Sequence, residues 1–384
     1  MPHSIHLGVP IASRVSPRGT GRGFTGILNW ILLAGAILLL GACASVGDSS
    51  ADKEEPIQTA WPNPPDAPRY VFQTFLRTLA DVRPESDEDR LQKMLTGVGV
   101  GDKLVYERPA SIAARDGRIY VADPQTSSVV VFDVPRRKIF RFGERPPNTL
   151  GRPNSIAIDD ASRIYVLDSK AKSVLVFDAL GLYQFRVGKP EDFTKPVGLA
   201  VSGDGRRIYV VDRGGLQEDD HKVVVYSPDG SIVQKLGPRG GEDGQFNIPL
   251  EAAVAPDGSL VILDSGNFRV QIFDSEGRFV RAFGSVGNGM GQFSRPRGLA
   301  VDGNANIYVA DASFNNVQVF DMEGHLLMAI GKPSLRGGPG EYALVGAVAA
   351  DRNGFVYVAD NFFKKIEVYQ QLPDGQAAPP MQKK

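Results

Sequence analysis

The sequence of 384 residues holds little of the chemistry on which most active sites depend. It contains one cysteine, Cys43, and four histidines. A single thiol excludes an internal disulfide, and so few histidines leave no cysteine–histidine pair for nucleophilic catalysis. The sequence also has no Gly-Lys-Ser or Gly-Lys-Thr loop, which excludes that kind of phosphate-cradling nucleotide site. We therefore predict no catalytic residue and no cofactor.

An excess of charge of either sign is also lacking. The chain has 43 basic and 44 acidic side chains, which gives a formal net charge of −1. Three of the arginines, Arg14, Arg18 and Arg22, lie in the first 42 residues, where no acidic residue occurs. The remainder is slightly acidic, so it lacks the broad basic character of proteins that bind nucleic acid or anionic lipid. We expect no nucleic acid partner.

Long apolar runs are scarce as well. Residues 27–42 form an uncharged run of 16 residues, which is shorter than the roughly 20 residues that a transmembrane helix needs. Arginines precede the run and small residues end it, which is the order found in an export signal. The sequence Leu40-Gly41-Ala42-Cys43 resembles a bacterial lipobox. That resemblance implies diacylation of the Cys43 thiol and cleavage just before it.

The residue after the cysteine bears on localisation. It is Ala44 rather than aspartate. In a diderm bacterium the lipobox resemblance then implies sorting to the outer membrane, with the folded domain facing the periplasm. The polar, proline-rich residues 43–68 are expected to form a flexible tether to this lipid anchor.

In contrast, turn and β-branched residues are abundant, and they recur with a regular period. The 43 glycines and 27 prolines are typical of turn-rich β structure. Six short apolar runs end in an aspartate, at spacings of 44 to 52 residues, which is a period typical of propeller blades. These aspartates are Asp123, Asp168, Asp212, Asp264, Asp311 and Asp360.

Each repeat predicts four antiparallel strands. A run led by proline is followed by a turn and the run that ends in aspartate, then by an alternating run such as "NVQVFD" and a last run after an acidic-Gly turn. A sheet with two apolar faces must stack on its neighbours, so we predict an all-β, six-bladed propeller. Residues 284–324 resemble an NHL repeat, and the resemblance extends over about 108–369. It implies a propeller used mostly as a binding platform, although some members are enzymes.

The ends of the domain are predicted from the incomplete last repeat. The sixth repeat lacks a fourth strand, and the β-like residues 69–75 are expected to supply it. A short helix should begin after Ser86 and end at Gly97, packing on the side or the base of the disc. The predicted organisation is therefore a signal peptide (1–42), a tether (43–68), a propeller (69–372) and a disordered tail (373–384).

The six aspartates could form an acidic catalytic or metal-binding ring, but a local structural role explains all of them. Each carboxylate can accept backbone N–H groups from the turn that follows, and the basic residues before four of the prolines could neutralise them. Those basic residues are Arg108, Arg152, Lys195 and Arg295. His221 and His325 are expected to be exposed on opposite faces, so they cannot share a zinc ion. No metal site is predicted.

Departures from the repeat provide the candidate partner-binding residues. An inserted loop in the third repeat carries Glu218, Asp219 and Asp220, although a merely solvated acidic loop is the alternative. Aromatic residues in equivalent loops of the later repeats could form an interaction patch, or they could pack between blades. They are Phe268, Phe314, Phe362 and Phe363. Phe246, Phe293 and Tyr342, in the connections between repeats, are assigned to the core.

The sequence therefore predicts a monomeric NHL-type propeller, anchored to the membrane through lipidated Cys43, that binds an envelope protein or another ligand. One alternative is a propeller enzyme of the lactonase or lyase type with a metal in its central pore. Another is a structural component of an envelope complex.

Overall fold

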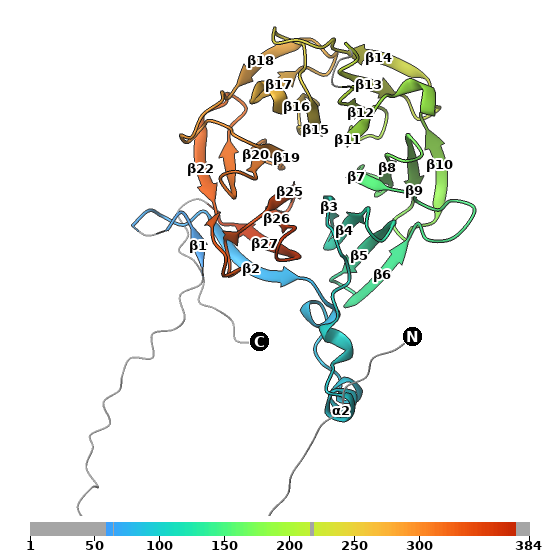
Figure 1. Ribbon diagram of the computed structural model, residues 1–384, viewed down its shortest axis with the longest axis vertical. Helices are drawn as coiled ribbons and strands as arrows, with labels where there is room; N and C mark the ends of the chain where they lie inside the picture. The colour runs from blue at the N-terminus through green and yellow to red at the C-terminus, as the bar shows by residue number, and fades with distance from the viewer. Residues whose placement is uncertain (1–58, 64, 216–218, 374–384) are drawn as a thin grey trace, which may run out of the picture. The chain divides into compact units, whose positions relative to one another are not determined.

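The computed structural model describes residues 59–63, 65–215 and 219–373, all within the compact unit Pro56–Lys384. The predicted signal peptide, Cys43, Glu218 and residues 374–384 lie outside these described residues. The described chain forms the predicted ring of six antiparallel blades, and the first strand of each blade lies nearest the centre (Figure 1).

Blades one to five each contain four consecutive strands that pair in sequence order. Blades one to three consist of β3 (Ser111–Arg115), β4 (Arg118–Asp123), β5 (Ser128–Asp133), β6 (Lys138–Phe142), β7 (Pro153–Ile158), β8 (Ile164–Asp168), β9 (Ser173–Phe177), β10 (Tyr183–Val187), β11 (Pro196–Val201), β12 (Ile208–Asp212), β13 (Lys222–Tyr226) and β14 (Ile232–Leu236). Blades four and five consist of β15 (Pro249–Val254), β16 (Leu260–Asp264), β17 (Arg269–Phe273), β18 (Phe279–Phe283), β19 (Pro296–Val301), β20 (Ile307–Asp311), β21 (Asn316–Phe320) and β22 (Leu326–Ile330).

Blade six closes the ring with strands from both ends of the domain. It contains β25 (Val345–Ala350), β26 (Phe355–Asp360) and β27 (Lys365–Gln371), and β2 (Tyr70–Leu76) pairs antiparallel with β27. The predicted closure by an N-terminal strand is therefore confirmed. Because two chain ends share one sheet, the ring opens only if these strands separate.

The ordered structure begins earlier than the sequence indicated. A fifth strand, β1 (Ala60–Trp61), lies within the predicted tether and pairs with β2. The Trp61 ring is 8% exposed and meets the Tyr369 ring edge-on, with 5.2 Å between the ring centroids. Burial of a large apolar side chain stabilises a fold by roughly 2–3 kcal/mol, which accounts for the order of this short strand.

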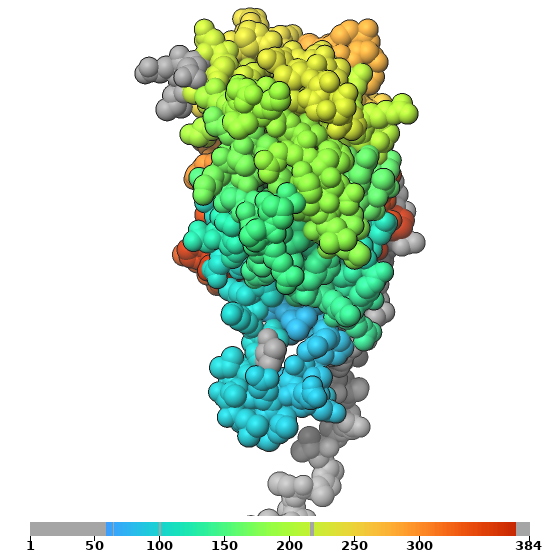
Figure 2. Space-filling model, turned by 90° about the vertical axis from the view of Figure 1, so that its right-hand side faces the viewer, coloured from blue at the N-terminus to red at the C-terminus, as the bar shows by residue number. Residues whose placement is uncertain are grey.

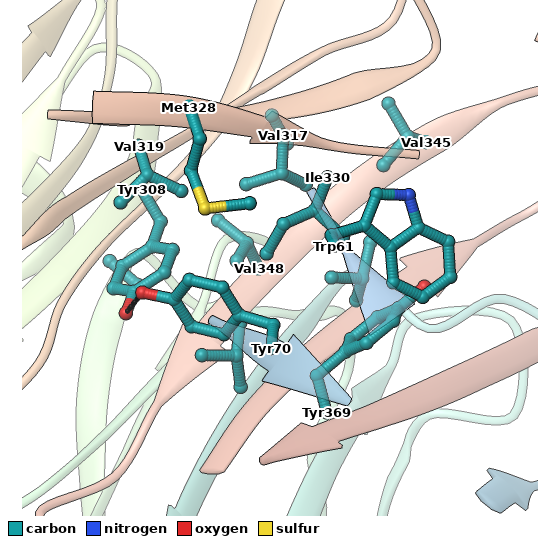
Figure 3. Packing of buried hydrophobic residues seen from close by; sticks show 14 of the residues in the cluster. Trp61, Tyr70, Tyr308, Val317, Val319, Met328, Ile330, Val345, Val348 and Tyr369 are labelled. Carbon is teal, nitrogen blue, oxygen red and sulfur yellow. Dashed lines mark hydrogen bonds between the residues drawn. The ribbon is translucent and has the colours of Figure 1, made fainter. Parts of the chain in front are cut away.

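The core lies between the blades, where facing sheets bury their apolar side chains. The cluster between blades five and six is drawn in Figure 3, in which the hydroxyls of Tyr70 and Tyr308 meet in a hydrogen bond of 2.9 Å. Phe246, Phe293 and Tyr342 are fully buried, so their assignment to the core is confirmed.

One α-helix, α2 (Asp87–Thr96), lies between β2 and blade one. The Ser86 side chain caps its N-terminus and Gly97 ends it with a left-handed backbone, as predicted. The helix packs on the short helix η2 (Val100–Asp102) and not against the disc, and it projects from the rim as a knob (Figures 1 and 2). The expectation that the helix packs on the side or the base of the disc was wrong. Three of its apolar side chains, Leu91, Met94 and Leu95, face solvent, as does Val98 just after the helix.

Other short elements occur in the connections. They are η1 (Leu79–Asp81), η3 (Pro190–Asp192), η4 (Ser265–Asn267) and the parallel pair β23 (Lys332–Pro333) and β24 (Glu341–Tyr342). Within the described part of the chain, no helix is long and apolar enough to cross a bilayer.

Candidate functional site

The two faces of the disc are built from different connections. One face carries the loops that follow the second strand of each blade, together with the connections between blades, and we call it the loop face. The other carries the tight turns after the first and third strands, and we call it the hairpin face. The central channel runs between them and is lined by the first strands.

The six repeated aspartates hold the loop face together. All six are buried. Asp168 is representative: its carboxylate accepts the N–H groups of Gly151 and Arg152, which precede the first strand, and of Lys170 and Ala171, which follow the aspartate. Each carboxylate thus ties a loop to the start of its own blade, and Asp264 does so with side-chain donors from Asn267 and Arg269 as well. These oxygen atoms are occupied by the fold and are not free for a substrate.

The expected pairing between the aspartates and the preceding basic residues does not occur. Arg152, Lys195 and Arg295 each donate their backbone N–H to the aspartate of their blade. Their side chains and that of Arg108 point elsewhere and are exposed. Amide N–H groups already satisfy most of these carboxylates. Where an ion pair forms, its basic partner starts the third strand of the blade, as Arg269 does for Asp264 at 2.9 Å and Lys222 for Asp212 at 3.8 Å. Basic side chains consequently remain unpaired around the channel mouth.

The aromatic residues of the loop face differ in exposure. Phe362 is 61% exposed and stands edge-on to Phe363, with 5.0 Å between the ring centroids. Phe363 is half-buried, and the Lys365 ammonium lies 5.3 Å from the centre of its ring. Phe268 and Phe314 are also half-buried, and Phe268 packs against the core between blades four and five. Phe362 is therefore the aromatic side chain of this set that a partner could reach most easily.

The inserted loop of blade three carries one exposed acid and one that is engaged. Asp219 is exposed, whereas the Asp220 carboxylate accepts the N–H of Gly215 at 3.1 Å. The third member of the predicted acidic group, Glu218, lies outside the described residues.

His221, which follows this loop, is not exposed as expected. It is 1% exposed, its Nε2 donates to the Gly215 carbonyl oxygen at 3.0 Å, and its Nδ1 accepts the Ile248 N–H at 3.2 Å. Ile248 has a φ of 51°, in the left-handed region that β-branched residues avoid. Such strain persists only where the surroundings hold it, and His221 is part of that support. The strained residue leads directly into β15.

The channel narrows around one carboxylate on β15. A cavity of about 50 Å³ is lined by first-strand residues of all six blades, and Glu251 is the one ionisable side chain among them. Its Oε2 lies 3.4 Å from the Ser155 hydroxyl on blade two, across the channel. Burial raises the pKa of Glu251 to about 8, an effect that the Ser155 hydrogen bond partly opposes. This carboxyl group is thus protonated at neutral pH.

The sequence does contain a signal for Glu251 that was overlooked. When the six first strands are aligned on their leading prolines, with Val345 in the place of proline in blade six, the same position is filled by small residues in the other blades. They are Ser111, Ser155, Gly198, Gly298 and Ala347. A glutamate in this series departs from the repeat.

On the hairpin face the channel widens into an open hollow of about 710 Å³. Asp160 of blade two lies there between two arginines of other blades, Arg115 at 3.2 Å and Arg352. Six aspartates and four arginines line this hollow, so acidic side chains slightly outnumber basic ones there.

The described residues offer few free ligands for a metal ion. No group of three or more His, Cys, Asp or Glu side chains among the described residues is arranged to hold a metal ion. The repeated aspartates are engaged by N–H donors, and Glu251 is alone in the channel neck. These donors do not fit the metal site that a propeller enzyme of the proposed alternative type would need.

Comparisons with known proteins support the architecture. A family model described as a 6-bladed beta-propeller, DUF5128, matches residues 147–236 and 253–324. No curated protein matches the sequence.

Solved structures with the same fold are distant in sequence. A protein of unknown function from Bacteroides thetaiotaomicron is similar with a TM-score of 0.55 and 16% identity, over 78% of this chain and 76% of that one. A catalytically inactive virginiamycin B lyase from Staphylococcus aureus, solved with quinupristin, is similar with a TM-score of 0.50 and 13% identity, over 70% of this chain and 97% of that one. Hydrazine synthase from Kuenenia stuttgartiensis is similar with a TM-score of 0.51 and 15% identity, over 71% of this chain and 84% of that one.

At such identities only the fold is shared. Taken with the six antiparallel sheets and their closure by β2, these matches identify the chain as a six-bladed β-propeller.

Proposed function

We propose that this chain is a lipid-anchored, NHL-type propeller of the cell envelope that presents its loop face as a binding platform. Cys43 would carry the acyl chains, and the propeller would face the periplasm from the outer membrane. One observation supports the binding-platform function. The six repeated carboxylates are buried and hold the loops in place, so only the side chains that differ between blades can give the loop face its binding specificity. Phe362 is the most exposed aromatic among them.

An enzyme is the second candidate, and one observation favours it. A partly buried glutamate with a raised pKa can act as a general acid near neutral pH. Glu251 has this property, but it lacks a second titratable group among the residues that line the channel neck with it. Acid–base chemistry commonly pairs two such groups, so the platform is the better supported function.

The anchor is tested by the chemistry of Cys43. A Cys43→Ser variant is expected to carry no lipid and, because cleavage follows acylation, to keep residues 1–42. Intact-mass analysis of the protein purified from membranes measures both effects. As a control, Ala44→Asp should remain acylated but move to the inner membrane. A Cys43→Ser protein of mature mass would contradict the lipobox assignment.

The platform is tested by photo-crosslinking from the loop face in intact cells. A photoreactive phenylalanine analogue at position 362 is expected to yield one or a few defined protein adducts. The matched control places the same group at Val280, which is 47% exposed on the outer strand β18 of blade four. Adducts that form equally from both positions would show that the loop face is not a specific platform.

A further inference from the structure

Six basic side chains surround the loop-face mouth of the channel without charge partners. Three immediately precede the first strands of their blades, and a fourth stands three residues before the start of β3. Of the other two, one follows the aspartate of blade three and one is the second residue of β19. No ion pair or side-chain hydrogen bond joins any of them to another described residue. They are Arg108, Arg152, Lys195, Arg295, Arg213 and Arg297.

These groups come from different blades but lie at the same end of the central channel, because the connections that lead into the first strands share the loop face. Arg297 lies on a first strand and therefore at the channel itself, while Arg108 and Arg213 come from blades one and three. Partial burial, together with repulsion from Arg295, Arg213 and Arg108, lowers the pKa of Arg297. The direction of this shift agrees with the placement of Arg297 and the other arginines at one end of the channel.

The carboxylates near the cluster form no ion pair with it. The repeated aspartates are buried beneath it and accept backbone N–H groups. Glu107 is paired with Lys364 at 2.6 Å. Asp220 is engaged by Gly215. The channel mouth thus presents basic side chains without direct ion-pair partners, although the chain as a whole is slightly acidic.

The composition of the cluster indicates the chemistry of its ligand. Five of the six residues are arginines, whose planar guanidinium groups match the paired oxygens of phosphate and carboxylate. The residues come from several blades, so a single small monovalent ion cannot satisfy them all. A ligand with several oxyanion groups would contact more than one blade at once and relieve the repulsion at Arg297.

We infer that the loop-face mouth of the channel binds a multivalent oxyanion, such as a phosphate-bearing small molecule or the headgroup of an anionic lipid. This inference rests on the proposed function, because it names the ligand chemistry of the same face. Binding should weaken with rising salt, because the contacts lie at an exposed surface.

The test is calorimetric titration of the full-length protein, in a neutral detergent, with inorganic pyrophosphate. An Arg108→Gln/Arg297→Gln variant should bind about tenfold more weakly or worse, because it removes two charged donors. The matched control, Arg206→Gln/Arg278→Gln, removes the same charge from exposed sites away from the mouth and should bind like the original protein; their side chains are 84% and 74% exposed. Soluble short-chain cardiolipin, whose headgroup carries two phosphates, and dihexanoyl phosphatidylcholine distinguish an anionic lipid headgroup from a free anion.

Pyrophosphate binding that the mouth variant alone loses supports a free anion as ligand. Binding of short-chain cardiolipin but of neither other probe, lost in the same variant, supports a lipid headgroup. The inference is overturned if neither anionic probe binds, or if the mouth variant binds them as well as the control does. Defined adducts from position 362 would leave the platform intact in those cases, so failure of this inference is distinguishable from failure of the proposed function.

Discussion

Replacing Lys365 with methionine should lower the free energy of unfolding by about 3–5 kcal/mol, since it leaves a buried charge without its partner. Lys365 and Glu367 lie on β27, and their side chains are 1% and 0% exposed. The Lys365 Nζ contacts Glu367 Oε1 and donates to the carbonyl oxygens of Gly338 at 2.8 Å and Glu341 at 2.7 Å. Equilibrium unfolding in urea measures the loss.

Two further variants show whether the buried charge is the cause. The double variant Lys365→Met/Glu367→Gln should be more stable than the single one, because a neutral amide can still accept the Gly340 N–H that Glu367 accepts at 2.9 Å. Blade five already uses this arrangement, where Gln318 accepts the Gly291 N–H at 2.8 Å.

The neighbouring Lys364–Glu107 pair provides the matched control. It is 40% and 49% exposed. Lys364→Met should therefore cost no more than about 1 kcal/mol. A Lys365→Met variant as stable as Lys364→Met would contradict the role assigned to the buried pair.

The blades could be predicted from the sequence because their signals are local and repeated. Alternating apolar residues, turn residues and a recurring aspartate occur in all six repeats, so an ambiguity in one blade is resolved by the others. The cap of α2 was also predictable, because Ser86 and Gly97 act on backbone groups only a few residues away. Closure by β2 followed from counting the strands of the last repeat.

Features that depend on distant partners could not be predicted. The two residues of β1 are too few to show a period, and Trp61 is held by the opposite end of the domain. A Cβ atom on Gly340 would lie 1.9 Å from the Trp61 ring, so the missing side chain of one residue makes room for the other. Nothing local to either residue indicates this fit.

In the candidate site, too, local features could be predicted from the sequence and features that depend on distant residues could not. The loops were located from the repeat, but the sequence does not reveal whether Arg152 or Arg295 offers its backbone or its side chain to an aspartate. His221 was expected at the surface because its loop is polar, yet its partner Ile248 is 27 residues away. Glu251 was visible as a departure from the repeat, whereas its burial follows only from closure of six strands around it.

Glu251→Gln should change the pH dependence of stability, because the folded and unfolded chains bind the Glu251 proton with different affinity. Burial raises the pKa of Glu251 from 4.5 to about 8. The folded protein holds the Glu251 proton more tightly, and the stability that this proton contributes is fully present below about pH 4.5. That stability is lost progressively as the pH rises through about 8, and no further loss occurs at higher pH. Glutamine cannot ionise, so the free energy of unfolding of the variant should rise relative to that of the original protein as the pH increases from about 4.5 to about 8.

The size of that gain reports how dry the channel neck is. A full proton difference is worth about 1.4 kcal/mol per pH unit, and water in the channel should reduce the slope to about 1. Urea unfolding of both proteins at intervals between pH 4.5 and 8 measures it. Glu323→Gln, at an exposed turn of blade five, should show a difference that does not vary with pH. If the Glu251→Gln difference is equally flat, Glu251 ionises normally in the folded protein, and the neck is hydrated rather than closed around a neutral acid.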